Sequence, residues 1–229
     1  MKPRASKLLK GLISRERRKR IEKILKRRTR YITVVLDNLY HPHNMSAVVR
    51  SCEAFGIQDL HAIEEENRFD PSHGIAMGAQ RWISVIRHPN SDACATWLRR
   101  HGYTLFAADP PERAERTRTK TSYMLQELPL SMGPLALVFG KELDGLNPHL
   151  RNLCDATVYI PMKGFTESLN VSVTAAICLY ELRKKLDALP SSVWQLSDEE
   201  RSTLRDEWYT KSVRHGPRVL KDLQSRQSS

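Results

Sequence analysis

Residues 158–182 read VYIPMKGFTESLNVSVTAAICLYEL, and we expect the rest of the chain to be organised around this stretch. It opens with three strand-forming residues that end at Pro161, as a β-strand would. Turn-rich residues 163–167 follow. A long helical pattern then begins near Ser168, whose hydroxyl we expect to cap the helix.

That helical pattern carries no charge between Ser168 and Tyr180. Apolar side chains fall on one helical face and also on the others: Val171, Ala175, Cys178, Leu179 and Leu182 on the first, Val173, Ile177 and Tyr180 elsewhere. A helix that is apolar nearly all round is buried on several sides, so we expect it to lie between its own sheet and a second subunit. Open α/β sheets bind ligands where a strand gives way to such a helix, although an ordinary core βα unit shows the same pattern.

The length of 229 residues is enough for one α/β core with appendages. No apolar run approaches the roughly 20 residues of a membrane span, and the start has no apolar signal region. The four cysteines contain no Cys-x-x-Cys pair: Cys52, Cys94, Cys154 and Cys178. We therefore expect buried thiols in a reducing compartment, and a cytoplasmic protein with no membrane contact.

The net charge of +11 is concentrated at the two ends of the chain. Residues 1–30 hold 14 Lys and Arg against two Glu, and residues 210–229 hold five against one Asp. Residues 31–209 are slightly acidic, with 18 Lys and Arg against 23 Asp and Glu. Basic ends on such a body indicate a polyanion-binding extension, and RNA or DNA is the natural polyanion.

Residues 5–28 predict a helix, because their Leu and Ile residues recur at helical spacing and cationic residues fill the other faces. We favour a helix that grips RNA. A membrane-surface helix is a weaker interpretation, because the apolar face lacks aromatic residues. A solvated basic helix is the third.

From Tyr31 onward, strand and helix patterns alternate. Apolar strands are predicted at 32–36, 60–63, 82–86, 103–107, 134–139 and 158–160. Helices are predicted at 46–55 with Asn44 as the cap, at 91–101, and at 147–153; residues 109–120 form a charged loop. The alternation predicts an α/β fold with a mostly parallel sheet and helices on both faces.

The end of the chain is expected to be helical as well. Residues 190–192 suggest a linker, and Ser197 with Glu200 forms a capping-box pattern for a helix at 198–209. The sequence His215-Gly-Pro217 breaks the chain before a last basic segment. We expect a basic helical extension at 1–30, a catalytic domain at 31–189 and a second basic extension at 190–229.

Phosphate-cradling glycine loops and Cys/His metal spacings are absent from the sequence. His41 and His43 have no spaced third ligand, so no metal is expected. Three polar loops follow predicted strands: His41 to Asn44 with Arg50, residues 140–145, and residues 163–170. Parallel strands end at one edge of their sheet, so these loops can converge.

The segments HPHNMSAVVR, FGKELDG and IPMKGFTESLNVSVTAA closely resemble the three motifs of the TrmH branch of the SPOUT methyltransferases. The resemblance extends from about residue 17 to about residue 219. It implies S-adenosylmethionine-dependent methylation of a ribose 2′-hydroxyl, a deep C-terminal trefoil knot, and a homodimer with the site at its interface. It also implies cofactor contacts, largely from backbone groups, at Ala108, Gly140, Ile160 and Leu169. Relatives often carry Thr where this chain has Ala108.

The resemblance gives the central role to Arg50, although guanidinium holds its proton up to pH 12 or beyond. Arg50 either binds phosphate and stabilises the developing alkoxide, or acts as the base when desolvated. His43 is an alternative base, because imidazole titrates near neutral pH. Asn44 would orient Arg50 or cap its helix.

The remaining candidates carry their own alternatives. Glu142 would fix its loop or the arginine, or remain a solvated carboxylate. Ser168 and Asn170 would bind cofactor or ribose, or only cap a helix. Lys141 and Lys163 can contact phosphate, but we favour the interpretation that they are ordinary surface lysines.

The resemblance and the basic ends together predict a tRNA methyltransferase acting on the D-loop guanosine at position 18. Larger-RNA relatives often carry a separate N-terminal RNA-binding domain, and 30 residues are too few for one. Another tRNA or ribosomal RNA nucleotide is an alternative target. A non-catalytic RNA-binding protein is a second alternative, disfavoured because the five candidate catalytic residues are all present.

Overall fold

The computed structural model describes residues 4–110, 121–141 and 145–226. The chain forms two compact units, one within Met1–Arg28 and Gln195–Ser229, the other at Thr29–Trp194. No helix in the described ranges is both long and apolar enough to cross a membrane.

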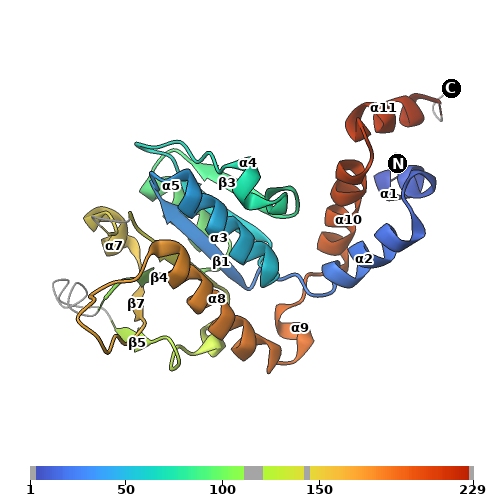
Figure 1. Cartoon of the computed structure of the whole chain (residues 1–229). Coiled ribbons are helices and arrows are strands. Elements are labelled where there is room, and N and C mark those ends of the chain that lie inside the picture. Colours follow the sequence, from blue (N-terminus) through green and yellow to red (C-terminus); the bar gives the residue numbers. More distant parts are fainter. Residues whose placement is uncertain (1–3, 111–120, 142–144, 227–229) are drawn as a thin grey trace. The chain divides into compact units, whose positions relative to one another are not determined.

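The unit at Thr29–Trp194 is built on a sheet of seven parallel strands in the order β3-β2-β1-β6-β4-β7-β5 (Figure 1). The strands are β1 Ile32–Asp37, β2 Asp59–Ile63, β3 Ser84–His88, β4 Thr104–Ala108, β5 Ser122–Met124, β6 Leu135–Phe139 and β7 Ala156–Tyr159. The predicted α/β class with a mostly parallel sheet is therefore confirmed.

Helices cover both faces of this sheet. The helical elements of this unit are α3 Pro42–Ala54, α4 His73–Ala76, η2 Ala79–Arg81, α5 Ser91–Arg100, η3 Leu130–Met132, α7 Pro148–Leu153, α8 Val171–Asp187 and α9 Ser191–Trp194. In β1, Val34 and Leu36 belong to a core shared with α3 and α8, while Val35 belongs to a second core shared with α5 and α7. The sheet is buried on both faces, which explains the continuous apolar strands.

The terminal unit is helical: α1 Ala5–Leu9, η1 Lys10–Leu12, α2 Arg15–Leu25, α10 Asp198–Ser212 and α11 Gly216–Arg226. The prediction of one helix over 5–28 was wrong. Ile13 is extended, and the Ser14 hydroxyl accepts a hydrogen bond from the Arg17 N–H at 3.2 Å, so a new helix begins there. Gly11 adds to the break because glycine disfavours helix interiors.

Both ends of the chain supply the buried side chains of the terminal unit. Helix α10 packs against α1 and α2, and Trp208 of α10 is 1% exposed. The guanidinium of Arg28 lies 5.2 Å from the Trp208 ring centroid. The capping box of Ser197 and Glu200 at the start of α10 is confirmed.

Helix starts account for two further corrections. Helix α3 begins at Pro42, with His41 at its N-cap, so Asn44 does not cap it. Proline suits the first helical position because its missing N–H would have no partner there anyway. Helix α8 is capped by Asn170, not by Ser168.

Smaller differences concern the edges and connections of the sheet. Strand β3 begins two residues later than predicted, because Trp82 ends the short η2 turn. Strand β5 was not predicted, and of the loop expected at 109–120, residues 111–120 lie outside the described ranges. The expected linker at 190–192 runs into the short helix α9.

Candidate active site

The carboxyl ends of four neighbouring strands bring the candidate loops to one edge of the sheet. In register, Leu36 of β1 lies opposite Phe139 of β6, and Ala108 of β4 lies opposite Val158 of β7. Strand β6 lies between β1 and β4 in the sheet. The loops that begin after Asp37, Ala108, Phe139 and Tyr159 therefore start side by side. The sequence predicted this for the first, third and fourth of them, and the structure adds the loop after Ala108.

Asn44 and Asn170 are brought together from positions 126 residues apart. Asn44 lies on α3 and is 6% exposed. The side-chain amide of Asn170 donates to the Asn44 Oδ1 at 3.2 Å. The Asn170 Oδ1 accepts from the Ser172 N–H at 2.8 Å and from the Ser172 hydroxyl at 2.6 Å. Asn170 thus caps α8 with its oxygen and links α8 to α3 with its nitrogen.

Arg50 lies on α3 with its side chain exposed. Its Nη1 donates to the Ile75 carbonyl at 3.3 Å, and α4, which contains Ile75, packs against α3. Within the described residues, no hydrogen bond connects Arg50 to Ser168 or Asn170. The contact that fixes this arginine in the single chain is therefore a backbone carbonyl.

His43 lies on the same exposed stripe of α3 as Arg50, seven residues earlier. Seven residues of α-helix correspond to a rise of about 10 Å. The imidazole and the guanidinium can therefore face one substrate from the same side of the helix, but from different turns.

The segment between β7 and α8 is exposed from Met162 onward and has no regular secondary structure. Across the described ranges, residues 161–169 make no hydrogen bond to another residue. Ser168 and Leu169 lie in this segment, and Ile160 precedes it at the end of β7. Its backbone N–H and C=O groups are consequently available to water or to a ligand.

Gly140 is required by the return of its own loop. A Cβ built there would lie 2.2 Å from the Gly145 carbonyl carbon and 2.2 Å from the Leu146 nitrogen. Lys141 and Gly145 exchange backbone hydrogen bonds of 2.9 and 3.0 Å. At Gly140 the missing side chain therefore allows a close approach of the chain to itself. Glu142 lies outside the described residues.

Asp37 and Asn38 are polar residues of this edge whose roles the sequence analysis missed. The Asp37 carboxylate accepts from the Asn147 N–H at 3.0 Å and from the Asn38 amide at 2.8 Å. Burial raises its pKa, and these hydrogen bonds act in the opposite direction. Asn38 has φ of 50° and accepts from the Glu66 N–H at 2.8 Å. An acidic residue directly after an apolar strand was the available signal.

Asp109 ties two of the loops together. Its carboxylate accepts from the Arg151 Nε at 2.5 Å, and both side chains are largely buried. Arg151 also donates to the Leu146 carbonyl at 3.4 Å. The end of β4, beside Ala108, is thereby joined to the loop that follows β6.

The cysteines and the two candidate lysines show no contact that assigns them a role in the site. All four thiols are free and buried, as predicted, and burial raises the pKa of Cys94 to about 12. Lys141 forms an ion pair with Glu66. Lys163 is exposed.

The fold and the paired helices α3 and α8 at the carboxyl edge of a parallel sheet agree with one known family. The model of the SpoU rRNA Methylase family matches residues 31–180. This range runs from the start of β1 into α8 and covers well over half of the chain. The chain therefore belongs to this family.

Named relatives narrow the class further. The chain is 33% identical to the tRNA (guanosine(18)-2′-O)-methyltransferase of Borreliella burgdorferi over 91% of both chains. It is 29% identical to the A. aeolicus TrmH/SpoU tRNA modifying enzyme, whose crystal structure superposes with a TM-score of 0.73, over 87% of this chain and 98% of that one. The SpoU methyltransferase AviRb of Streptomyces viridochromogenes, solved in complex with AdoMet, is 25% identical with a TM-score of 0.59, over 71% of this chain and 60% of that one.

Proposed function

We propose that this protein transfers a methyl group from S-adenosylmethionine to the ribose 2′-hydroxyl of the guanosine at position 18 of tRNA. The observation that carries this proposal is the similarity to a guanosine-18 methyltransferase along nine-tenths of both chains. That similarity includes the terminal segments, which lie outside the range matched by the family model. Relatives of one length and one specificity support a shared substrate better than a shared fold does.

The loops at the carboxyl edge of the sheet fit S-adenosylmethionine. The uncommitted backbone groups of residues 161–169 can hydrogen-bond an adenine and an amino-acid group without any particular side chain. Ala108, Gly140 and Ile160 stand at the ends of neighbouring strands, and we assign the cofactor contacts to them and to Leu169. When bound, the cofactor supplies an electrophilic methyl group. Because these contacts use backbone groups, cofactor binding would not need the threonine hydroxyl that relatives often carry at the position of Ala108.

The protein has to align the target hydroxyl and help its proton to leave. We assign Arg50 to the phosphate and developing alkoxide of the target, because an exposed guanidinium offers several donors beyond the one used by Ile75. Asn44 and Asn170 would hold α3 against the start of α8, and Ser168 would contact cofactor or ribose. Glu142 lies outside the described residues, and its assignment to its own loop or to the arginine stays a prediction.

Two candidates remain for the group that accepts the proton. A desolvated Arg50 has no support in the single chain, where this side chain is exposed. His43 is exposed on the same stripe, and its imidazole can serve as a general base. Full activity in His43→Ala, together with no activity in Arg50→Lys, would remove the histidine as base. A pH–rate profile whose acidic limb disappears in His43→Ala would support it.

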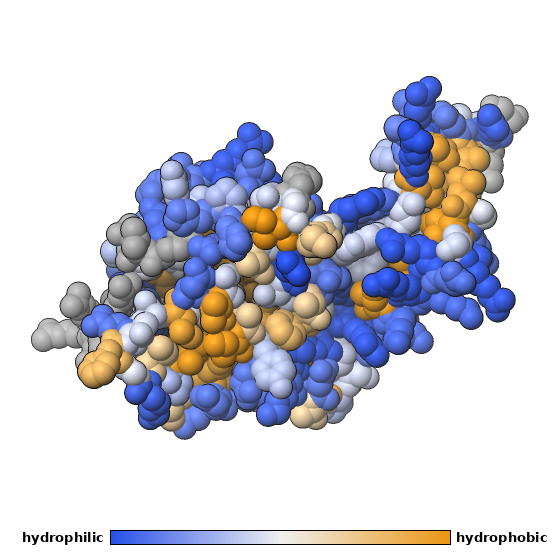
Figure 2. All heavy atoms as spheres, viewed as in Figure 1, coloured by the Kyte–Doolittle hydropathy of each residue, from blue (hydrophilic) through white to orange (hydrophobic). Residues whose placement is uncertain are grey.

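A homodimer is part of the proposal. Val173, Ile177 and Tyr180 follow helical spacing along α8 and are 45, 38 and 59% exposed in the single chain. Figure 2 shows hydrophobic side chains gathered at the surface over α8. A second subunit would cover this stripe, and could then contribute to the pocket beside α8.

The deep trefoil knot implied by the family is also proposed. One feature of the fold supports it: β7 lies three places from β1 in the sheet, yet the helix after it packs on α3, which follows β1. The segment 160–170 therefore has to bring the chain back across the ends of β4 and β6.

The test uses labelled S-adenosylmethionine, the purified protein and an unmodified tRNA transcript. We expect 2′-O-methylguanosine at position 18 of the D-loop. The matched control is the same tRNA with 2′-deoxyguanosine at that position, which offers no hydroxyl and should accept no label. Label on another nucleotide, or on ribosomal RNA alone, would replace the substrate in this proposal. RNA binding without any transfer would leave the non-catalytic alternative.

A further inference from the structure

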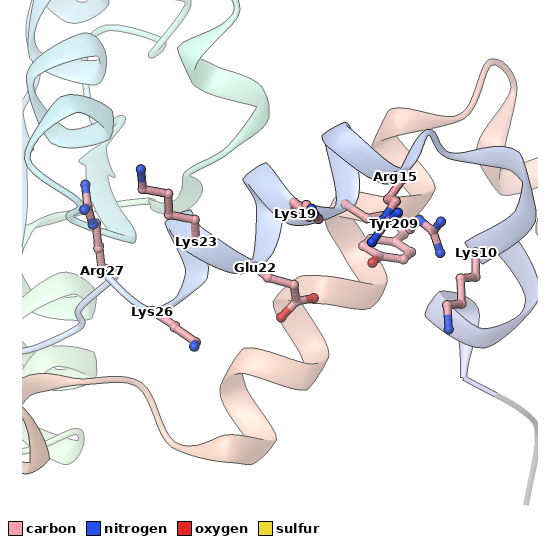
Figure 3. Close-up of a pocket in the computed structure, with 9 residues that line it drawn as sticks. Lys10, Arg15, Lys19, Glu22, Lys23, Lys26, Arg27 and Tyr209 are labelled. Atoms are coloured by element: carbon pink, nitrogen blue, oxygen red, sulfur yellow. The ribbon is translucent and has the colours of Figure 1, made fainter.

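A groove of about 700 Å³ lies within the terminal unit and is lined by seven Lys and Arg side chains, one glutamate and Tyr209. Figure 3 shows the labelled cations following α2, with Lys10 on the preceding segment and Tyr209 on α10. The concentration of positive charge in one hollow goes beyond a generally basic surface. It is a candidate binding site for an anion with several negative charges.

The spacing of the cations suits an extended partner. Arg15, Lys19, Lys23 and Lys26 occur at intervals of four, four and three residues, which place them along one face of α2. The helix rises about 1.5 Å per residue, so this row extends over about 16 Å. All four side chains are exposed. A single small anion would use one or two of these cations, whereas a polyanion can use the whole row.

The carboxylate in the groove lining is already neutralised. Glu22 accepts two hydrogen bonds from the Arg205 guanidinium of α10, at 2.6 Å from Nε and 2.8 Å from Nη2. In Figure 3 the Glu22 carboxylate points toward α10. Charge-assisted bidentate hydrogen bonds of this kind are stronger than hydrogen bonds between neutral groups. Arg205 therefore turns the negative charge of Glu22 away from a ligand in the groove.

The apolar residues of α2 show which polyanion fits. Ile21 and Leu25 are 3 and 1% exposed, and α10 packs against this helix. A membrane-surface helix needs a free apolar face to enter the lipid boundary, and here that face is used inside the unit. A hydrophilic polyanion remains, and a phosphodiester chain places charges at regular intervals along its length.

We propose that this groove binds the phosphate backbone of RNA, and that Arg205 is a positioning residue that keeps Glu22 from opposing the bound phosphates. The inference rests on the proposed function for the identity of the RNA. It adds that the two ends of the chain build one binding site together. Contacts to phosphate carry no sequence information, so this site supplies affinity and not the choice of nucleotide.

The first test measures equilibrium binding of unmodified tRNA by the full chain without S-adenosylmethionine, at several salt concentrations. We expect Lys19→Gln/Lys23→Gln to weaken binding about tenfold and to lower the slope of log K against log salt by about 1.5 to 2. The matched control, Lys7→Gln/Arg20→Gln, removes the same charge from exposed positions on α1 and α2 that do not line the groove. Equal losses of tRNA affinity in both variants would show diffuse electrostatic attraction and would contradict specific binding in the groove.

The second test separates the role of Arg205 from simple loss of charge. Arg205→Gln should weaken tRNA binding about fivefold, because Glu22 is released into the groove. Glu22→Gln/Arg205→Gln should return to near the wild-type affinity, although it lacks the same ion pair. Arg201→Gln is the control, since Arg201 is on the same helix but pairs with Asp198. A double variant as weak as Arg205→Gln would contradict the positioning role.

Two further measurements keep this inference distinct from the proposed function. Methyl transfer at saturating tRNA should survive in Lys19→Gln/Lys23→Gln, with the loss confined to KM. If the wild-type protein binds tRNA through the groove but transfers no methyl group, the RNA-binding role of the groove is supported and the proposed methyl transfer is wrong. Binding to vesicles containing 30% phosphatidylserine that depends on Lys19 and Lys23, with no binding to tRNA, would overturn the choice of RNA.

Discussion

Asn170 shows how one residue can serve both helix formation and a site. Its oxygen caps α8 while its nitrogen donates to Asn44, so the two roles use different atoms. We expect Asn170→Ala to cost about 1 kcal/mol of unfolding free energy through the lost cap. Asn170→Asp keeps a capping oxygen and should stay within about 0.5 kcal/mol of wild type.

The functional assignment of Asn170 predicts a different order for activity. Asn170→Asp loses the donor to Asn44 and places a carboxylate against the Asn44 oxygen, so methyl transfer should fall as far as in Asn170→Ala. Urea denaturation gives the stability, and single-turnover transfer to tRNA gives the activity. Normal activity in Asn170→Asp would reduce this residue to a helix cap.

His61 and His88 form a second residue-scale feature, buried under α5. The His61 Nδ1 and the His88 Nε2 lie 2.9 Å apart, and the Trp97 ring centroid is 4.8 Å from that of His61. Burial, followed by the neighbouring His88 and His101, lowers the pKa of His61 from 6.5 to about 3. Burial lowers the pKa of His88 as well. The folded protein therefore keeps both rings neutral where an unfolded chain would protonate them.

The sign of the resulting pH dependence follows from proton counts. Between about pH 6.5 and 3 the unfolded chain binds more protons at His61, so stability falls as the pH falls. From pH 7 to pH 5 this residue should cost about 2 kcal/mol, at 1.36 kcal/mol per pH unit below 6.5. His88 acts in the same direction. The raised pKa of Asp37 acts in the opposite direction at lower pH, because the folded state then holds the extra proton.

The measurement compares urea denaturation at pH 7 and pH 5 in wild type and in His61→Phe, which keeps an aromatic ring beside Trp97. The variant should be less stable at pH 7, because His88 loses its partner, but its stability should change about 2 kcal/mol less between the two pH values. Identical pH dependence in both proteins would mean that another group controls acid stability.

At the scale of elements, α8 carries both a buried and an exposed apolar face. Ala175, Leu179 and Leu182 are fully buried against the sheet and α3, whereas Ile177 is exposed. We expect Ile177→Asp to convert the proposed homodimer to monomers, because the charge would have to be desolvated in the interface. Light scattering coupled to size exclusion measures the mass.

The matched control for that variant is Thr96→Asp, which places the same charge at an exposed position of α5. It should remain dimeric. Monomers of Ile177→Asp should also lose methyl transfer if the neighbouring subunit completes the pocket. A wild-type protein that is monomeric at micromolar concentration would contradict the proposed interface.

Elements were predictable from the sequence where burial alone decides them. Strands β1, β2, β4 and β6 are mostly apolar because both faces of the sheet are covered. The predicted ranges lie within one or two residues of them. The short edge strand β5 has no such pattern, and its partner is β7. Its existence depends on sheet pairing that no local signal reports.

Helix starts were less predictable, and this limited the candidate site. Ser168 and Asn170 are both good capping residues, and so is Asn44. Which of them caps depends on where the chain leaves the sheet. The resemblance to a known family pointed to Asn44 and Asn170, but their contact requires α8 to pack on α3. The contacts of Asp37 with Asn147 and of Asp109 with Arg151 depend on how the loops converge, which no local pattern reports.

At the scale of the whole molecule, the two ends of the chain form a unit that neither end could form alone. Leu9 and Ile21 from the start are buried together with Leu204 and Trp208 from the end. The Ser6 N–H also donates to the Asp206 Oδ1 at 2.7 Å. The sequence showed two basic extensions, and their shared core could not be read from either charge pattern.

The unit at Thr29–Trp194 has cores of its own on both faces of the sheet. Its two ends are held together by the Thr29 hydroxyl, which donates to the Trp194 carbonyl at 2.7 Å. We therefore expect a chain of residues 29–194 to melt cooperatively and to bind S-adenosylmethionine within about threefold of the full chain. Its affinity for tRNA should fall by at least tenfold, because the groove is gone.

A chain of residues 29–229 should be more prone to association than this shorter chain. It keeps α10 but lacks the partners of Leu204 and Trp208, so it exposes an apolar surface that is covered in the full chain. Binding of a hydrophobic dye and the mass in solution distinguish the two truncations, and calorimetry gives S-adenosylmethionine affinity. If residues 29–229 stay monodisperse, bind no dye and keep the tRNA affinity of the full chain, then the N-terminal segment contributes neither to the core of the terminal unit nor to the groove.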